Sequence, residues 1–102
     1  SAAPVVIVVA VDPRPCAARY SDRGEYLYAI QDTAAAAENI LLAAVDRGLA
    51  SCWIGAFDQS AVAEAIGAVA PITPVAVLPS GYSAESAGRP ARRPLEEVTT
   101  WL

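Results

Sequence analysis

The chain has 102 residues, which is enough for one domain, and its net charge of −4 argues against a nucleic-acid partner because no basic stripe is present. No apolar run reaches the roughly 18 residues that a membrane-spanning helix needs, and no secretory signal pattern stands at the N-terminus, so we expect a cytoplasmic protein that enters no membrane. Hydrophobic residues make up 55% of the chain and charged residues 18%, so we expect part of this apolar surface to meet a partner subunit or another segment.

The first predicted element is a strand over residues 4–11, PVVIVVAV. This β-branched run does not alternate with polar residues, which is typical of a strand buried on both faces. Residues 12–24 contain two prolines and the turn-like SDRG, and they predict a loop. Residues 25–30, EYLYAI, are short and remain ambiguous.

A long helix is predicted next. It begins at Asp32 or Thr33, either of which can cap the first turn, and it ends at Gly48 after a basic last turn. Its polar residues share one narrow face, and nearly all the others are Ala, Leu, Ile or Val. A helix that is apolar on most sides is buried on most sides, so we expect a central helix or a subunit-interface helix. The polar residues are Glu38, Asn39 and Asp46.

The following region predicts two further strands and a short helix between them. Residues 50–54 read as a buried strand, and residues 58–66 read as a helix with Asp58 as its N-cap. Residues 72–78, ITPVAVL, predict the third strand. Pro74 cannot donate a ladder hydrogen bond, so we expect it at the start of this strand or at a sheet edge.

The last predicted region is a tail. Residues 79–94 are polar, contain Gly and Pro, and predict an extended segment. Residues 95–102 form a short amphipathic piece that finishes in Trp101 and Leu102. This tail has no evident core of its own to join.

Side chains for acid–base, nucleophilic or metal chemistry are scarce. The chain has no His, its carboxylates are scattered, and it contains no phosphate-loop glycine motif, so we predict neither a catalytic side chain nor a metal site. Cys16 and Cys52 are expected to be free thiols, with Cys52 acting as a small buried hydrophobic residue. Any catalysis would therefore depend on a bound cofactor.

Two features are candidates for cofactor binding. Gly55 and Ala56 follow a strand, where small residues let a ligand approach the backbone amides, although a simple strand-to-helix turn also fits. Arg92 and Arg93 are adjacent guanidinium groups that suit a phosphate, although a solvated tail also fits.

The order of four motifs resembles the C-terminal half of the nitroreductase family. The motifs are APVVIVVAVD, IQDTAAAAENILLAAVDRGLASCWIGAFD, PVAVLPSGY and RPARRPLEEV, of which the second is the most specific. The resemblance covers nearly all 102 residues. It implies an α+β fold with a mixed, largely antiparallel sheet flanked by helices, in which residues 1–102 form a single partial domain and residues 83–102 an extended C-terminal tail.

The resemblance also implies a cofactor and an assembly. Members of the family bind FMN, use NAD(P)H as hydride donor and form tight homodimers with FMN at the subunit interface. The family pattern places the backbone of Gly55 and Ala56 beside the reactive edge of the flavin, and Arg92 and Arg93 near its phosphate. The tail would wrap the neighbouring subunit, which would bury Trp101.

Two functions follow as expectations. The first is an FMN-dependent NAD(P)H oxidoreductase of nitroreductase type, or the C-terminal fragment of one, that acts on a small molecule as a homodimer or with a separate N-terminal half. That N-terminal half carries much of the flavin site in the family, and it has no counterpart in this sequence. The alternative is a non-catalytic dimeric assembly or binding module without flavin. A doubly wound nucleotide-binding domain fits the strand–helix order but lacks the glycine motif.

Overall fold

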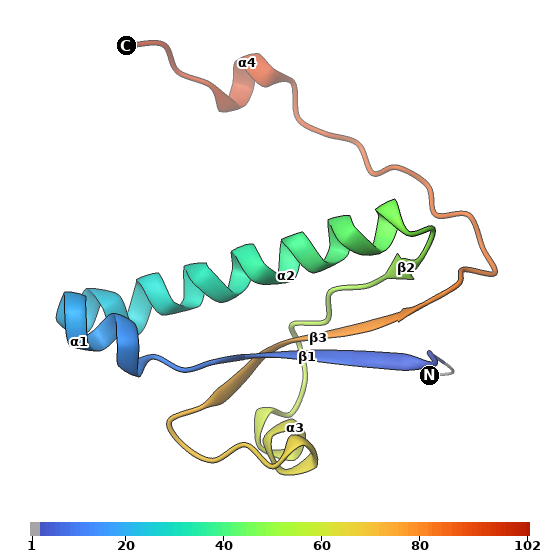
Figure 1. Cartoon of the computed structure of the whole chain (residues 1–102). Helices are drawn as coiled ribbons and strands as arrows, with labels where there is room; N and C mark the ends of the chain where they lie inside the picture. The colour runs from blue at the N-terminus through green and yellow to red at the C-terminus, as the bar shows by residue number, and fades with distance from the viewer. Residues whose placement is uncertain (1–2) are drawn as a thin grey trace.

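The computed structural model describes residues 3–102 and contains a three-stranded antiparallel sheet (Figure 1). The central strand, β3 (Thr73–Gly81), pairs along its length with β1 (Val5–Val11). On its other side β3 pairs with the two-residue β2 (Ala50–Ser51), and Val77 of β3 forms an isolated bridge with Ile54. The strand order is β1-β3-β2, with the two shorter pairings on one edge.

Helices cover both faces of this sheet (Figure 1). On one face α2 (Ala29–Asp46) packs its Ala37 against Ala76 and Leu78 of β3, and these three side chains are the buried centre of the core. On the other face α3 (Gln59–Ile66) lies over the alternate residues of β1 and β3. The predicted α+β class, with helices flanking a largely antiparallel sheet, is confirmed.

The predicted loop over residues 12–24 is wrong, because this region is helical. It contains α1 (Arg14–Arg23) and the first residue of a five-residue π-helix, η1 (Gly24–Tyr28), which runs directly into α2. The two prolines that suggested a loop lie at the start of α1, where a missing amide proton costs no helical hydrogen bond. Asp12 precedes them and accepts a hydrogen bond from the amide of Arg14 at 3.1 Å.

A sharp corner separates α1 from the helices that follow. Ser21 has a φ of 52° and a ψ of −138°, which breaks the helical path there. Gly24 then passes so close to α1 that a Cβ atom at this position would collide with the carbonyl group of Cys16. The absence of a side chain at Gly24 therefore lets the two helical segments pack against each other.

Helix α2 begins at Ala29 as a continuation of η1, so the predicted start at Asp32 or Thr33 is late. Its end agrees with the prediction, since Gly48 follows the last turn with a φ of 73°. The prediction that this helix is buried on most sides is wrong for the single chain. Only one stripe of α2 is buried, and Leu42 is 59% exposed. The other sides of α2, which include the exposed residues Ala34, Ala35 and Ala36, face outward.

The two outer strands are less buried than predicted. Strand β1 keeps its predicted extent, but it lies at the sheet edge, and its residues Val5 and Val6 are each 54% exposed. The predicted buried strand over residues 50–54 shortens to β2 and the bridge at Ile54, because the chain leaves the ladder in between. For the same reason Cys52 is exposed, which contradicts its predicted burial.

The elements around α3 follow the sequence closely. Asp58 caps α3 as predicted, and Gly67 ends it with a φ of 69°. Pro74 is the second residue of β3, so it marks the start of this strand, as expected. The strand continues through Pro79, beyond the predicted end, because the carbonyl of Pro79 still accepts a hydrogen bond from the amide of Cys52 at 3.3 Å.

The tail after β3 extends away from the sheet and passes on the far side of α2 (Figure 1). It contains the single helical turn α4 (Leu95–Val98) and ends with Trp101 90% exposed. Across residues 3–102, no helix has both the length and the apolar character needed to span a bilayer.

Candidate functional site

The connection from β2 to α3 carries Gly55 and Ala56, and it is held at both ends. At one end the amide of Ile54 donates a hydrogen bond to the carbonyl of Val77 at 2.9 Å, and the amide of Val77 donates back at 3.0 Å. At the other end the carboxylate of Asp58 accepts a hydrogen bond at 2.9 Å from an amide in the first turn of α3. The short connection is therefore fixed by the sheet and by the helix it joins.

The amides of Gly55 and Ala56 are free to bind something else. Neither amide donates a hydrogen bond to any group within residues 3–102, and both residues are exposed. A Cβ atom placed on Gly55 would meet only Nε1 of Trp53, at 4.0 Å. The open backbone and its two unpaired donors fit the electron-rich edge of a flat cofactor such as a flavin.

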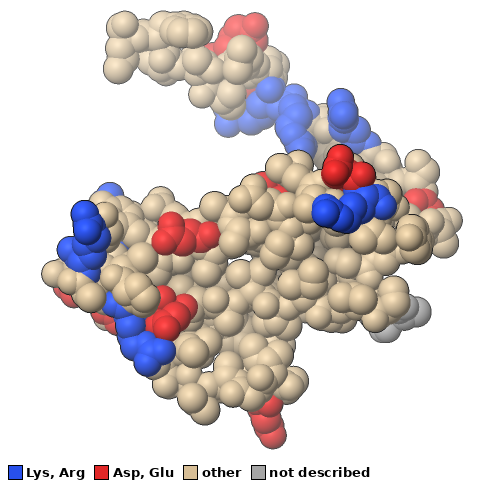
Figure 2. Space-filling view, in the orientation of Figure 1, with Lys and Arg blue, Asp and Glu red and all other residues tan. Residues whose placement is uncertain are grey.

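Arg92 and Arg93 lie in the tail immediately before α4. Nε of Arg93 is 3.4 Å from Oε2 of Glu97, and both side chains are exposed, so this ion pair contributes little to stability. Arg92 has no carboxylate partner among the described residues. Both guanidinium groups are thus available to an anion, and Figure 2 shows basic side chains gathered along this tail.

The two predicted parts of the site do not meet within one chain. The connection that holds Gly55 and Ala56 runs along the sheet toward α3, whereas the tail that holds Arg92 and Arg93 lies beyond α2 (Figure 1). A common site would therefore need groups from a second polypeptide.

The ionisable side chains with shifted pKa values lie elsewhere, at the start of α1. Hydrogen bonds from Arg14 lower the pKa of Asp12 to about 2, and the two side chains form an ion pair of 2.8 Å. Partial burial raises the pKa of the Cys16 thiol, which also contacts Oδ2 of Asp32 at 3.5 Å. A raised pKa keeps Cys16 protonated, so this thiol is a poor nucleophile.

A cluster of aromatic and basic side chains lies at the corner between α1 and η1, and the sequence analysis did not identify it. The rings of Tyr20 and Tyr28 pack edge to face with centroids 5.2 Å apart. Nε of Arg19 donates to the hydroxyl of Tyr20 at 2.9 Å, and Nε of Arg23 donates to that of Tyr28 at 3.0 Å. These contacts connect α1 with η1. The sequence feature that could have identified the cluster is the spacing of each Arg–Tyr pair, adjacent in one case and separated by four residues in the other.

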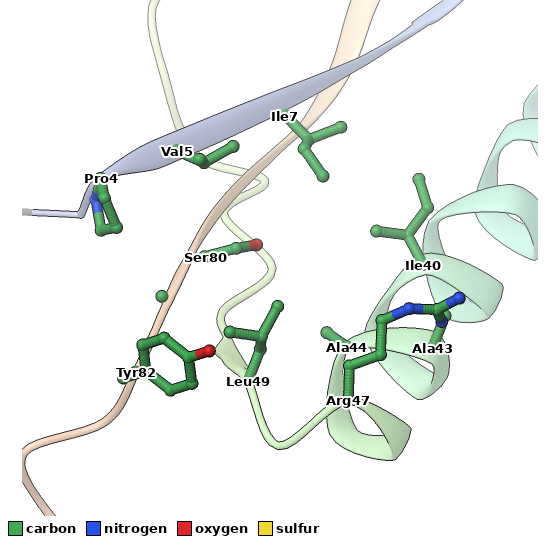
Figure 3. A pocket seen from close by; sticks show the side chains of 11 residues that line it. Pro4, Val5, Ile7, Ile40, Ala43, Ala44, Arg47, Leu49, Ser80 and Tyr82 are labelled. Atoms are coloured by element: carbon green, nitrogen blue, oxygen red, sulfur yellow. The ribbon is translucent and has the colours of Figure 1, made fainter.

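An apolar groove of about 440 Å³ lies between the C-terminal end of α2 and the adjoining ends of β1 and β3 (Figure 3). The polar side chains among its lining residues are those of Arg47, Ser80 and Tyr82 (Figure 3). An open apolar groove of this kind is typical of a surface that another segment or a ligand covers. The remaining lining residues are Pro4, Val5, Ile7, Ile40, Ala43, Ala44, Leu49 and Gly81.

Trp53 was not predicted as a site residue, because the sequence indicated only that it belongs to a buried strand. Trp53 is 41% exposed and lies between two residues whose amides are bonded to β3. The sequence feature that could have identified Trp53 is its position two residues before Gly55, near the end of the apolar run.

Comparison with known proteins identifies relatives of this chain. The family described as the nitroreductase family matches residues 1–82. Among solved structures, a nitroreductase family protein from Streptococcus pneumoniae is 30% identical with a TM-score of 0.74. One from Clostridium difficile is 26% identical with a TM-score of 0.82, and a candidate NAD(P)H:FMN oxidoreductase from Staphylococcus epidermidis is 27% identical with a TM-score of 0.74. No curated protein matches the chain.

The match involves most of this chain but only part of each relative. The three structures align with 82%, 98% and 87% of this chain, respectively. The aligned regions are 42%, 60% and 42% of the relatives' own lengths. The chain thus spans about half the length of the solved structures that it matches.

Proposed function

This chain belongs to the nitroreductase family, and from that premise we propose that it contributes the C-terminal part of an FMN-dependent oxidoreductase. Such an enzyme takes hydride from NAD(P)H and reduces a small molecule, for which nitro and quinone-like compounds are the proposed class. The observation that carries this proposal is the pair of unbonded amides at Gly55 and Ala56 on open, fixed backbone. A relative named as an NAD(P)H:FMN oxidoreductase supports the choice of cofactor.

The residues of this chain would bind and orient the cofactor, and the chain contains no His to act as a general base. FMN supplies the hydride chemistry when bound. The amides of Gly55 and Ala56 would donate hydrogen bonds to the flavin edge where negative charge develops, and their fixed positions mean that little reorganisation is needed. Arg92 and Arg93 would bind the phosphate through charge-assisted hydrogen bonds.

We propose that the functional form is a homodimer in the cytoplasm. The exposed sides of α2, with Ala36, Leu42 and Val45, form the proposed contact surface. The tail leaves Leu95 and Trp101 exposed, and it lies on the other side of α2 from the connection between β2 and α3 (Figure 1). A tail that crosses to the neighbouring subunit would bury these apolar side chains and bring guanidinium groups to that subunit's amides.

Further polypeptide is also part of the proposal. The solved relatives are longer than this chain, and the apolar groove beside α2 is open in the single chain. We propose that a segment corresponding to the other half of the relatives, on the same or a separate polypeptide, completes the flavin site.

Titration of the purified protein with FMN tests the proposal. We expect a bound flavin spectrum that survives gel filtration and a dimer of matching stoichiometry. A protein that stays colourless at every FMN concentration, both alone and with any polypeptide that co-purifies with it, would contradict the oxidoreductase function.

The second candidate is a non-catalytic dimeric assembly or binding module without flavin. The observation in its favour is the separation of Gly55 and Ala56 from Arg92 and Arg93 within one chain (Figure 1). A stable dimer that binds neither FMN nor NAD(P)H would select this candidate.

A further inference from the structure

We propose that the indole N–H of Trp53 is a third hydrogen-bond donor to the flavin, alongside the amides of Gly55 and Ala56. The inference rests on the proposed function, because it concerns the same site. It adds a side chain to the flavin-edge part of the site, which the sequence pattern assigns to backbone amides.

The first observation is the position of the indole nitrogen. Apart from Gly55 and its two chain neighbours, Nε1 of Trp53 is the only heavy atom among residues 3–102 within 4 Å of the place where a side chain of Gly55 would begin, at a distance of 4.0 Å. The nitrogen end of the ring, and not its carbon edge, therefore borders the open space in front of Gly55. A ligand that covers Gly55 on this side would lie beside the indole nitrogen.

The second observation is that this donor is unused. The indole N–H of Trp53 bonds to no acceptor within residues 3–102, and the residue is 41% exposed. The indole nitrogen is a donor only, and a tryptophan that becomes buried usually finds an acceptor for it. A ligand that covers this surface must supply that acceptor or leave the donor unsatisfied.

The third observation is that the backbone around Trp53 is fixed. The amide of Cys52 donates to the carbonyl of Pro79 at 3.3 Å, and the amide of Ile54 donates to that of Val77 at 2.9 Å. Trp53 is thus held from both sides by the central strand. Three donors with fixed origins stabilise charge without reorganisation when it develops.

The chemical consequence concerns the two redox forms of FMN. Reduced FMN carries more negative charge at its edge than oxidised FMN, so an extra donor there binds the reduced form more tightly. The indole N–H therefore raises the affinity of this protein for reduced FMN relative to oxidised FMN.

The test compares Trp53→Phe, which keeps an aromatic ring but removes the N–H, with Trp53→Leu and with the control Tyr26→Phe, which removes the hydroxyl from an exposed ring outside the proposed site. The purified protein in its native assembly is titrated with oxidised FMN, and the reduction potential of the bound flavin is measured against a reference dye. We expect Trp53→Phe to reduce the preference for reduced FMN by about three- to tenfold, where tenfold corresponds to about 30 mV for a two-electron couple. Tyr26→Phe should leave the potential unchanged.

The outcomes separate this inference from the function on which it rests. If the wild-type protein binds FMN and Trp53→Phe has the same potential, the indole N–H is no donor to the flavin and the inference is overturned. A loss that appears in Trp53→Leu but not in Trp53→Phe also overturns it, since ring packing would then be the cause. A wild-type protein that binds no FMN removes the proposed function itself.

Discussion

The connection from β2 to α3 and the C-terminal tail both carry candidate residues for the proposed flavin site, but they are held in opposite ways. The connection is fixed by a bridge to β3 at Ile54 and by the cap at Asp58, so its amides have fixed positions in the single chain. The tail lies away from the sheet, and its apolar residues Leu95, Val98 and Trp101 are exposed (Figure 1). In the proposed site, the amide half would be a property of the fold, whereas the guanidinium half would depend on assembly.

The largest expected effect comes from the core that supports the fixed connection. Leu78→Ala removes a fully buried side chain from β3, and we expect it to lower the free energy of unfolding by about 2–5 kcal/mol, since the cavity cannot close completely. Urea unfolding measures this loss. The same change at Leu95 in the tail should cost about 0.5 kcal/mol or less at protein concentrations where the chain is monomeric. Equal losses would show that the tail packs as firmly as the sheet.

The guanidinium half of the site is tested by the double change Arg92→Ala with Arg93→Ala. Charge-assisted hydrogen bonds contribute about 1.5–3 kcal/mol each, so we expect FMN affinity to fall at least tenfold. Fluorescence titration with FMN measures this affinity. The control Arg14→Ala removes the same kind of exposed side chain from the start of α1 and should change the affinity by less than about twofold. An equal fall in the control would mean that overall charge, and not the tail, governs binding.

The proposed dimer contact, on which the position of the tail would depend, is tested at Ala36 on an exposed side of α2. Ala36→Trp places a large ring where a close helix contact is proposed, and overpacking of this kind costs about 1–3 kcal/mol. We expect the dimer dissociation constant to rise by about five- to 150-fold, as measured by sedimentation equilibrium. Ala65→Trp makes the same change on α3 and should leave the dimer intact. A dimer that tolerates Ala36→Trp lies on another surface.

The N-cap of α3 also stabilises the connection between β2 and α3, but by less than the buried core does. Asp58→Ala leaves an amide of the first turn without its acceptor and should lower the free energy of unfolding by about 1 kcal/mol. Thermal unfolding measures the change. The control Asp46→Ala removes a carboxylate from the C-terminal end of α2, where negative charge is unfavourable, so it should not destabilise the protein. Similar losses in both variants would mean that net charge, and not the cap, is responsible.

The smallest expected effect is the contribution of Asp12 to the pH dependence of the free energy of unfolding. Its pKa is lowered from 3.8 to about 2 by hydrogen bonds from Arg14, so its stabilising contribution is complete above the ordinary pKa and is lost as pH falls through about 2. Asp12→Asn should therefore be slightly less stable than the wild-type protein at pH 7 and equally stable near pH 2. Thermal unfolding across this range measures the difference. A difference that is the same at both pH values would exclude the ion pair as its source.

The sequence could predict the features of the fold that depend on neighbouring residues, but not those that depend on contacts between distant segments. Asp58 and Gly67 act through local backbone chemistry, so the limits of α3 could be predicted from neighbouring residues alone. The region of α1 could not, because its two prolines stand at a helix start as readily as in a loop. The corner at Gly24 depends on the approach of α1, which no local pattern encodes.

The candidate site was predictable to the same extent. Gly55 and Ala56 were identifiable because a strand pattern stops at small residues, and the structure agrees that their amides are unbonded. The exposure of Cys52 and the placement of Trp53 beside Gly55 depend on where the chain leaves the ladder of β3. That departure is set by pairing between distant segments, so the sequence alone could not locate it.

Gly55 separates what this chain needs for folding from what it needs for binding. Its φ is not in the left-handed region, and a methyl group there would meet only one atom, at ordinary contact distance. Alanine would therefore fit the folded chain at this position without strain. In the proposed site, the demand for a bare backbone would come from the flavin and not from folding. A screen for expression or heat resistance would then score this glycine as dispensable, and only a screen for bound flavin would reveal its value.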